Sequence, residues 1–237
     1  MKPTNIAFYI RSRPSADESI LERHAKVVSG MREVGPPLGW KGLTMPPTPD
    51  CGENLTAHYA IRYPTPGLEV GGYYSYRDEK YLSPDKAYLD DCLEFIFKST
   101  NKHLDYSAIL QRYFPEVIQA FGGYRAKVSI GVYGSTYSGG INDGNPIYRK
   151  LLDDPAIDVD GRNNIFTLQP AMYWDGLLCK RALGYDRDEV IRRLEGKVPQ
   201  VMPLMDGVYT VFNDDPNLSY EAFVAINDTF KPILGLE

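Results

Sequence analysis

The sequence is poor in the residue types that most often carry chemistry. Among 237 residues there are three cysteines, three histidines and two tryptophans. Cys51, Cys92 and Cys179 are odd in number and widely spaced, which predicts free thiols rather than a disulfide framework. The histidines are not three or four residues apart, and none has a cysteine at zinc-ligand spacing. We therefore expect no metal site and no cofactor.

Positive charge and long apolar runs are also scarce. The formal net charge is -5, whereas a nucleic-acid-binding protein usually presents a basic face. No window approaches the roughly 20 apolar residues of a membrane-spanning helix. Residues 1–5 lead directly into a strand-like segment, with no apolar signal region before it. These features predict a cytoplasmic protein that contacts neither nucleic acid nor a membrane directly.

Familiar catalytic motifs are missing too. There is no Gly-x-x-x-x-Gly-Lys loop and no Gly-x-Gly-x-x-Gly fingerprint. The glycine-rich segment 134–145 contains serines, but not at the spacing of a hydrolase elbow. Adjacent acids such as Asp90 and Asp91 are interpreted as surface acids, here in a helix, because sequence shows no converging geometry. We expect a protein that is not an enzyme; the alternative is an uncharacterised enzyme with its site at residues 134–145.

Tyrosine is the residue type in which the sequence is rich, with eighteen in all. Two stretches concentrate tyrosines beside glycines, residues 71–77 and 131–140. A tyrosine ring offers a broad apolar surface with a polar tip and loses little entropy when ordered, so such stretches favour a binding surface. Tyrosine is also a good strand former, which would place part of the set in the core. The candidate partner-binding residues are Tyr73, Tyr74, Tyr76, Arg77, Tyr137, Asp143, Asp153 and Asp154.

The hydrophobic pattern predicts an α+β fold in which an antiparallel sheet carries helices packed on one face. We expect a single domain over residues 1–237, with two similar halves as a possible internal arrangement. Strands are predicted over 6–11, 56–63, 68–76, 126–133 and 164–168, and in a hairpin over 201–212 around Asp206 and Gly207. Helices are predicted over 17–34, from Ser83 to about Ile96, over 105–121 with a break at Pro115, over 171–183, over 186–197, and from Ser219 onward.

Four segments together resemble the immunity protein 52 family of bacterial polymorphic toxin systems. They are Ala7-Phe8-Tyr9-Ile10-Arg11, Gly71-Gly72-Tyr73-Tyr74, Gly131-Val132-Tyr133-Gly134, and residues 206–212 followed by a capped helix. The resemblance implies a protein that protects the producing cell from a cognate toxin. Such toxins are often restriction-endonuclease-like nucleases delivered by contact-dependent or type VI secretion. No functional residue of the family can be transferred to a position here, and the oligomeric state stays open.

The resemblance implies that the protein acts by occluding the toxin's active cleft. A nuclease cleft is basic because it receives phosphates, so an acidic inhibitor would be steered toward it. On this hypothesis Tyr74→Ala or Tyr137→Ala speeds dissociation, whereas Asp153→Asn slows association. An adaptor of a secretion apparatus is a third reading of the same surface features.

Overall fold

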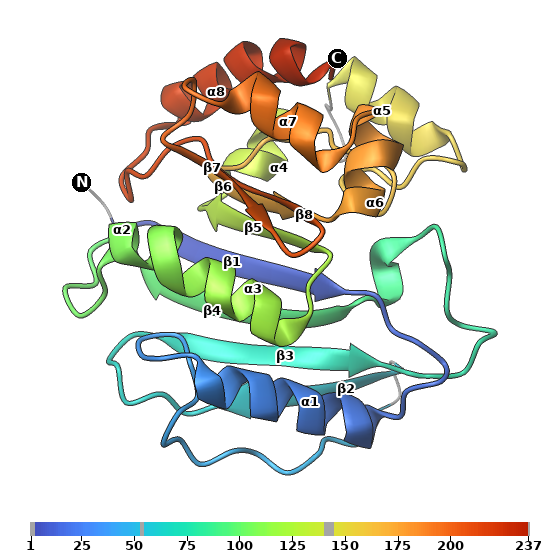
Figure 1. Cartoon of the computed structure of the whole chain (residues 1–237), viewed down its shortest axis with the longest axis vertical. Coiled ribbons are helices and arrows are strands. Elements are labelled where there is room, and N and C mark those ends of the chain that lie inside the picture. Colours follow the sequence, from blue (N-terminus) through green and yellow to red (C-terminus); the bar gives the residue numbers. More distant parts are fainter. Residues whose placement is uncertain (1–2, 53–54, 140–144, 237) are drawn as a thin grey trace.

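A computed structural model describes residues 3–52, 55–139 and 145–236, and its strands form one eight-stranded sheet (Figure 1). The strand order is β2-β3-β4-β1-β5-β6-β8-β7, and every neighbouring pair is antiparallel. The strands are β1 (Asn5–Ser12), β2 (Thr56–Ile61), β3 (Glu69–Ser75), β4 (Asp91–Lys98), β5 (Arg125–Ile130), β6 (Ala171–Trp174), β7 (Gln200–Leu204) and β8 (Gly207–Val211).

The helices are short, and two of them are continued by π-helical turns. They are α1 (Ile20–Glu33), α2 (Tyr106–Ala108), α3 (Phe114–Phe121), α4 (Tyr133–Ser138), α5 (Pro146–Asp153), α6 (Gly176–Leu178), α7 (Arg187–Leu194) and α8 (Tyr220–Leu234). Residues 109–113 and 179–183 are π-helical, and a 3₁₀ turn covers 87–89. Pro115 is the second residue of α3 and directly follows the π-helical turn, so the predicted break corresponds to a change of helix type in a segment that is helical throughout.

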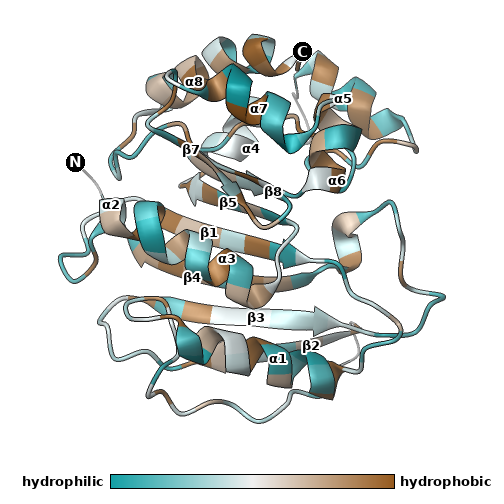
Figure 2. Cartoon of the chain, viewed as in Figure 1, coloured by the Kyte–Doolittle hydropathy of each residue, from teal (hydrophilic) through white to brown (hydrophobic). Residues whose placement is uncertain are grey.

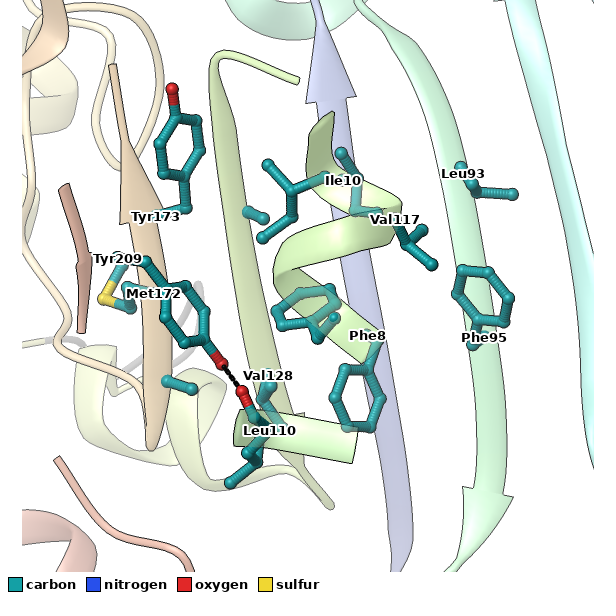
Figure 3. Packing of buried hydrophobic residues seen from close by; sticks show 14 of the residues in the cluster. Phe8, Ile10, Leu93, Phe95, Leu110, Val117, Val128, Met172, Tyr173 and Tyr209 are labelled. Atoms are coloured by element: carbon teal, nitrogen blue, oxygen red, sulfur yellow. Dashed lines mark hydrogen bonds between the residues drawn. The ribbon is translucent and has the colours of Figure 1, made fainter. Parts of the chain in front are cut away.

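Strand alternation gives the middle of the sheet two different faces. Phe8 is fully buried, and it pairs with Phe95 of β4 and Val128 of β5 on the same side. We call this side the apolar face. Figure 3 shows its side chains meeting Val117 of α3, and the ring of Phe114 lies edge-on to Phe8 with centroids 4.8 Å apart. This packing holds α3 against β1, β4 and β5, and on the same side His24 of α1 packs against Tyr74 of β3.

The opposite side of β1, β4 and β5 carries Arg11, Cys92 and Lys127, and we call it the polar face. Residues of the polar and apolar faces alternate along each strand, because successive side chains of a strand point to opposite sides. Figure 2 shows how hydrophobic residues run along β1 while hydrophilic residues occupy the outer turns of α7.

The helices divide between the two faces. Besides α1 and α3 on the apolar face, α4 lies over the polar face, where Gly134 and Ser135 line the same cavity as Lys127. Helix α8 covers β6 from that side, since Phe230 contacts Phe212, which in turn contacts Trp174. The α+β class and the antiparallel sheet are confirmed, but the helices are not confined to one face.

Residues 83–96 are the largest error in the sequence-based assignment. They were predicted to be a helix, yet the segment makes only the 3₁₀ turn before β4 begins at Asp91. Strand β4 lies between β3 and β1, so five of its eight residues are buried and its apolar residues fall on both faces. A strand covered on both sides loses the polar alternation that identifies strands, and its apolar residues then also fit helical spacing.

The predicted and observed secondary structure differ in three further segments, for similar reasons. Residues 171–174 form the fully buried strand β6 rather than the start of a helix, and helical turns follow only from Gly176. Residues 164–168 form no strand. The start of the glycine-rich segment is helical, as α4, although it was expected to be a loop. Short apolar runs do not distinguish a buried strand from a buried helix.

Both halves of the chain run through a similar series of elements. In the first half β1 and α1 precede a β2–β3–β4 meander that returns to pair with β1, and α3 follows. In the second half β6 and α7 precede a β7–β8 hairpin that returns to pair with β6, and α8 follows. An internal duplication stays a prediction. None of the helices in the described residues has both the length and the apolar character needed to cross a membrane.

Candidate functional site

Two adjacent aspartates, Asp90 and Asp91, are completely buried at the start of β4. The Asp91 carboxylate accepts hydrogen bonds from Nε of Arg23 on α1 at 3.0 Å and from both terminal nitrogens of Arg77 at 2.8 Å. The backbone amide of Ser75 donates to it at 3.0 Å. A buried carboxylate is tolerated only when its charge and lone pairs are satisfied, and here two guanidinium groups do so.

Asp90 has its own partners. Arg162 donates to the Asp90 carboxylate through two nitrogens, of which Nε lies 3.1 Å away, and the Tyr124 hydroxyl donates at 2.5 Å. Burial raises the pKa of Asp90 above its usual value, although Arg162 opposes the shift. The prediction of solvated acids in a helix was wrong. Consecutive residues entering a strand point to opposite sides, so the two carboxylates form ion pairs with different arginines.

These two networks anchor the segment 76–89, which we call the tyrosine loop. At one root Arg77 also donates to the carbonyl oxygen of Glu18 at 3.1 Å. Arg162, which binds Asp90 at the other root, also donates to the carbonyl oxygen of Ser83 within the loop. Lys86 Nζ donates to the carbonyl oxygen of Ile157 at 2.7 Å. The loop is therefore tied to the buried aspartates and to the segment that follows α5.

The tyrosine loop presents aromatic rings and acids to solvent. Tyr88 is 68% exposed and Tyr76 is 38% exposed. The rings of Tyr76 and Tyr81 lie 5.8 Å apart between centroids. Glu79 and Asp85 are exposed in the same loop, and Asp85 forms a 3.1 Å ion pair with Arg181. Exposed tyrosines on an anchored loop are the composition of a protein-binding surface rather than of a hydrophobic core.

The structure separates the tyrosines that the sequence had grouped together. Tyr74 is fully buried; its ring stacks on Tyr59 at 4.9 Å, and its hydroxyl shares a 3.1 Å hydrogen bond with Nδ1 of His24. The prediction that Tyr74 contacts a partner is therefore wrong, because the ring lies in the core. Tyr73 points to the opposite side, where its hydroxyl accepts a hydrogen bond from Arg11 and the ring is half-buried.

Arg77 was also predicted to contact a partner, but its guanidinium is turned inward. Its side chain is only 9% exposed and is occupied by Asp91, so Arg77 positions the tyrosine loop. Tyr137 is half-buried, with its ring against Phe166 and Phe223. This packing leaves Tyr137 less available to a partner than Tyr76, which was correctly placed at the surface.

The predicted acids lie near the end of α5. Asp153 and Asp154 are both exposed there, a few residues before the segment that holds the tyrosine loop. Asp143 lies outside the described residues. Sequence reasoning missed Tyr88, because residues 83–96 were assigned to a helix. Pro84 and Asp85, both turn-forming residues, were the available signal that the chain turns there before entering a strand.

A cavity of about 610 Å³ opens on the polar face. Strands β1 and β5 supply Arg11, Arg125 and Lys127 to its floor, and α4 supplies Ser135 and Ser138 to its wall. The alternative site at 134–145 thus borders this cavity in its described part.

Elsewhere, the three cysteines are free thiols, as predicted. The described residues contain no cluster of histidine, cysteine and acidic side chains able to hold a metal ion.

Comparison with known proteins gives one structural likeness to report. No protein-family model matches the chain, and no curated protein matches it. Among solved structures, the Pseudomonas aeruginosa T6SS protein PA0821 is similar over 98% of this chain and 73% of its own, at 12% identity and a TM-score of 0.46. A likeness at this level does not extend to activity or partners.

Proposed function

We propose that this chain is an immunity protein that binds a cognate secreted toxin and blocks its active cleft. The observation that carries the proposal is the tyrosine loop, an exposed aromatic segment held at both roots by buried ion pairs. A few tyrosines at the centre of an interface often supply most of its binding energy. The action requires occupation of the toxin and no catalysis.

Anchoring the loop favours tight binding. A flexible loop loses conformational entropy when it binds, at about 0.5–1.5 kcal/mol for each immobilised side chain. Arg77, Arg162 and Lys86 restrain the tyrosine loop before any partner arrives. A partner therefore meets Tyr76 and Tyr88 on a backbone that is already ordered.

Charge supports a basic partner. The chain carries a net charge of -5, and the exposed acids Asp153 and Asp154 lie at the end of α5. A nuclease active cleft is basic because it must receive a phosphate backbone. Opposite charge raises the association rate of such a pair. This is the reason to propose a nuclease toxin.

The experiment is co-expression with the product of the adjacent open reading frame, scored for rescue from toxicity, followed by kinetics of the purified pair. Tyr88→Ala and Tyr76→Ala are expected to raise the dissociation rate by about 30-fold or more, the scale of a hot-spot residue. Leu177→Ala is the matched control, because Leu177 is 44% exposed but lies on α6, outside the loop.

Each result has a defined meaning. Rescue that the two tyrosine variants weaken and Leu177→Ala leaves intact supports the proposal. Rescue that no loop variant changes places the interface elsewhere. If the neighbouring gene product is not toxic but forms a stable complex, the adaptor reading replaces inhibition. For the charge argument, Asp153→Asn and Asp154→Asn are expected to slow association at low salt and leave dissociation unchanged.

A further inference from the structure

Three cations gather on the polar face inside the cavity. Arg11 of β1 and Arg125 of β5 are directly paired across the two strands, and Lys127 lies two residues farther along β5, opposite Tyr9. Residues paired in an antiparallel sheet are close neighbours, and like charges in such positions repel each other. Arg125 is 7% exposed, so water screens this repulsion poorly.

None of the three cations forms an ion pair with a carboxylate of the described residues. Arg11 donates to the Tyr73 hydroxyl, and Arg125 Nη1 donates weakly to the carbonyl oxygen of Gly161 at 3.4 Å. The Lys127 ammonium lies over the Tyr9 ring, 5.8 Å from its centroid. The buried aspartates of the tyrosine loop, by contrast, are matched by their own arginines.

One carboxylate, Asp160, lines the cavity and attracts Lys127, but its single negative charge does not balance three cations. One oxygen of Asp160 is occupied by the backbone amides of Phe166 at 2.9 Å and Thr167 at 3.1 Å. Burial, together with the positive charge of Arg125, lowers the pKa of Lys127 to about 8. An uncompensated cluster of this kind is costly, and an anion bound among the three cations would remove the cost.

The rest of the lining suits an organic anion. Gln169 is 3% exposed, and its Oε1 has no hydrogen-bond partner in the described part of the chain. This acceptor needs a donor, such as a hydroxyl or amino group of a ligand. Ser129, Ser135 and Thr167 add hydroxyl groups to the wall. The volume of about 610 Å³ is within the usual range for small-molecule sites.

We propose that the cavity between β1, β5 and α4 binds a small organic phosphate, with Arg11, Arg125 and Lys127 around the phosphate and Gln169 accepting a hydrogen bond from a hydroxyl or amino group. All three cations project from the same face of the sheet, so together they can offset the double negative charge of a phosphate ester, to which guanidinium groups donate paired hydrogen bonds. This site is separate from the tyrosine loop and does not depend on the proposed toxin.

The test is calorimetric titration with three probes: inorganic phosphate, ribose phosphate and succinate. Ribose phosphate is expected to bind at least about ten-fold more tightly than inorganic phosphate, because its sugar hydroxyls can donate to Gln169 while its phosphate stays among the cations. Lys127→Met is expected to lower the affinity for ribose phosphate by about ten-fold or more, because a charge-assisted contact is lost. The same variant should raise the melting temperature of the ligand-free protein, since it removes a repelling charge.

A matched pair of variants on α4 separates the cavity from the surface around it. Ser135 lines the cavity and is exposed, so Ser135→Glu places a carboxylate at the mouth without disturbing the core. Thr136 is the next residue on the same helix, exposed but outside the lining. Ser135→Glu should abolish ribose phosphate binding, whereas Thr136→Glu should leave it within about two-fold.

Four outcomes would overturn the proposal. They are no binding of ribose phosphate at about 10 mM, which is weaker than any specific site; equal affinity for ribose phosphate and inorganic phosphate; succinate binding as tightly as ribose phosphate; and equal weakening by the two α4 variants. The last result would indicate general attraction between surface charges. Because Ser135→Glu changes an exposed residue, it gives a result even if Lys127→Met fails to fold.

Discussion

The two faces of the central strands obey opposite rules, although one strand alternation produces both. On the apolar face Phe8, Phe95 and Val128 pack against α3 without a polar atom among their side chains. One residue away, Arg11 and Lys127 line a cavity in which cations outnumber carboxylates. The first face explains why the protein folds. The second face lowers the stability of the folded protein because its buried positive charges are unpaired, and such a cost is typical of a surface kept for binding.

The aspartates at the start of β4 extend this comparison, because there the charges are matched. We expect Asp91→Ala to be the most destabilising substitution, at the upper end of about 3–5 kcal/mol, since it leaves Arg23 and Arg77 buried without an anion. Chemical denaturation measures the effect. Asp78→Ala removes an acid from an exposed ion pair and should cost under about 1 kcal/mol. Similar losses in the two variants would contradict the described network.

Neighbouring substitutions on β1 test the two faces directly. Phe8→Ala should lower the free energy of unfolding by about 3–5 kcal/mol, because it opens a hole in a close-packed core. Tyr9→Ala, on the half-buried polar face, should cost less than half as much because its ring borders a cavity. Urea unfolding of both proteins gives the comparison. A larger loss for Tyr9→Ala would show that the faces are assigned the wrong way round.

The pH dependence of the free energy of unfolding tests whether the Lys127 ammonium is unpaired in the folded protein. The pKa of Lys127 is about 8 in the folded protein and 10.5 ordinarily, so between these values the unfolded chain binds more protons. This group therefore makes the protein more stable as pH rises from about 8 to about 10. The groups that face it are Arg11, Arg125, Asp160 and Cys92, and burial raises the pKa of the Cys92 thiol to about 11.

Lys127→Met should remove that rise. The variant is expected to exceed the wild type by about 1–2 kcal/mol near neutral pH, and the difference should shrink as the pH approaches 10. Denaturation at several pH values measures it. A variant that is less stable than the wild type at neutral pH would mean that the Lys127 ammonium is stabilised by an anion in the folded protein.

The smallest effect is expected where the tyrosine loop meets solvent. Tyr88→Ala should change the free energy of unfolding by less than about 0.5 kcal/mol, since the ring is 68% exposed. Tyr74→Ala, in the core, should cost about 3–5 kcal/mol. Thermal unfolding of the pair distinguishes a tyrosine available to a partner from one that packs. A large loss for Tyr88→Ala would argue that the loop is part of the core.

Much of the fold could be predicted because its signals are local. The alternation of Ile6, Phe8 and Ile10 identified β1, and Ser219 marked the start of α8, where its side chain accepts from the Ala222 amide. Strand β4 could not be identified in this way. Both of its faces are covered, so the pattern that would distinguish a strand from a helix is missing.

The candidate site was predictable only in part. Tyr76, Asp153 and Asp154 were placed at the surface from composition alone, and they are exposed. Tyr74 and Arg77 stand beside Tyr76 in the sequence but point into the protein. Tyr74 lies in β3 and packs against α1, whereas Tyr76 lies just past the end of that strand; α1 and Asp91, which bury Tyr74 and Arg77, come from other parts of the chain.

The amino-acid sequence alone determined the α+β class, most strands and helix starts, the acidic balance and the abundance of tyrosine, because these depend on composition and on spacing within a few residues. The assembled fold determined which tyrosines face solvent, and it brought Arg23, Arg77 and Arg162 to adjacent aspartates. It also set Arg11 opposite Arg125. Contacts between residues more than sixty positions apart, such as Arg23 with Asp91 and Arg162 with Asp90, depend on strand order, which no local pattern records.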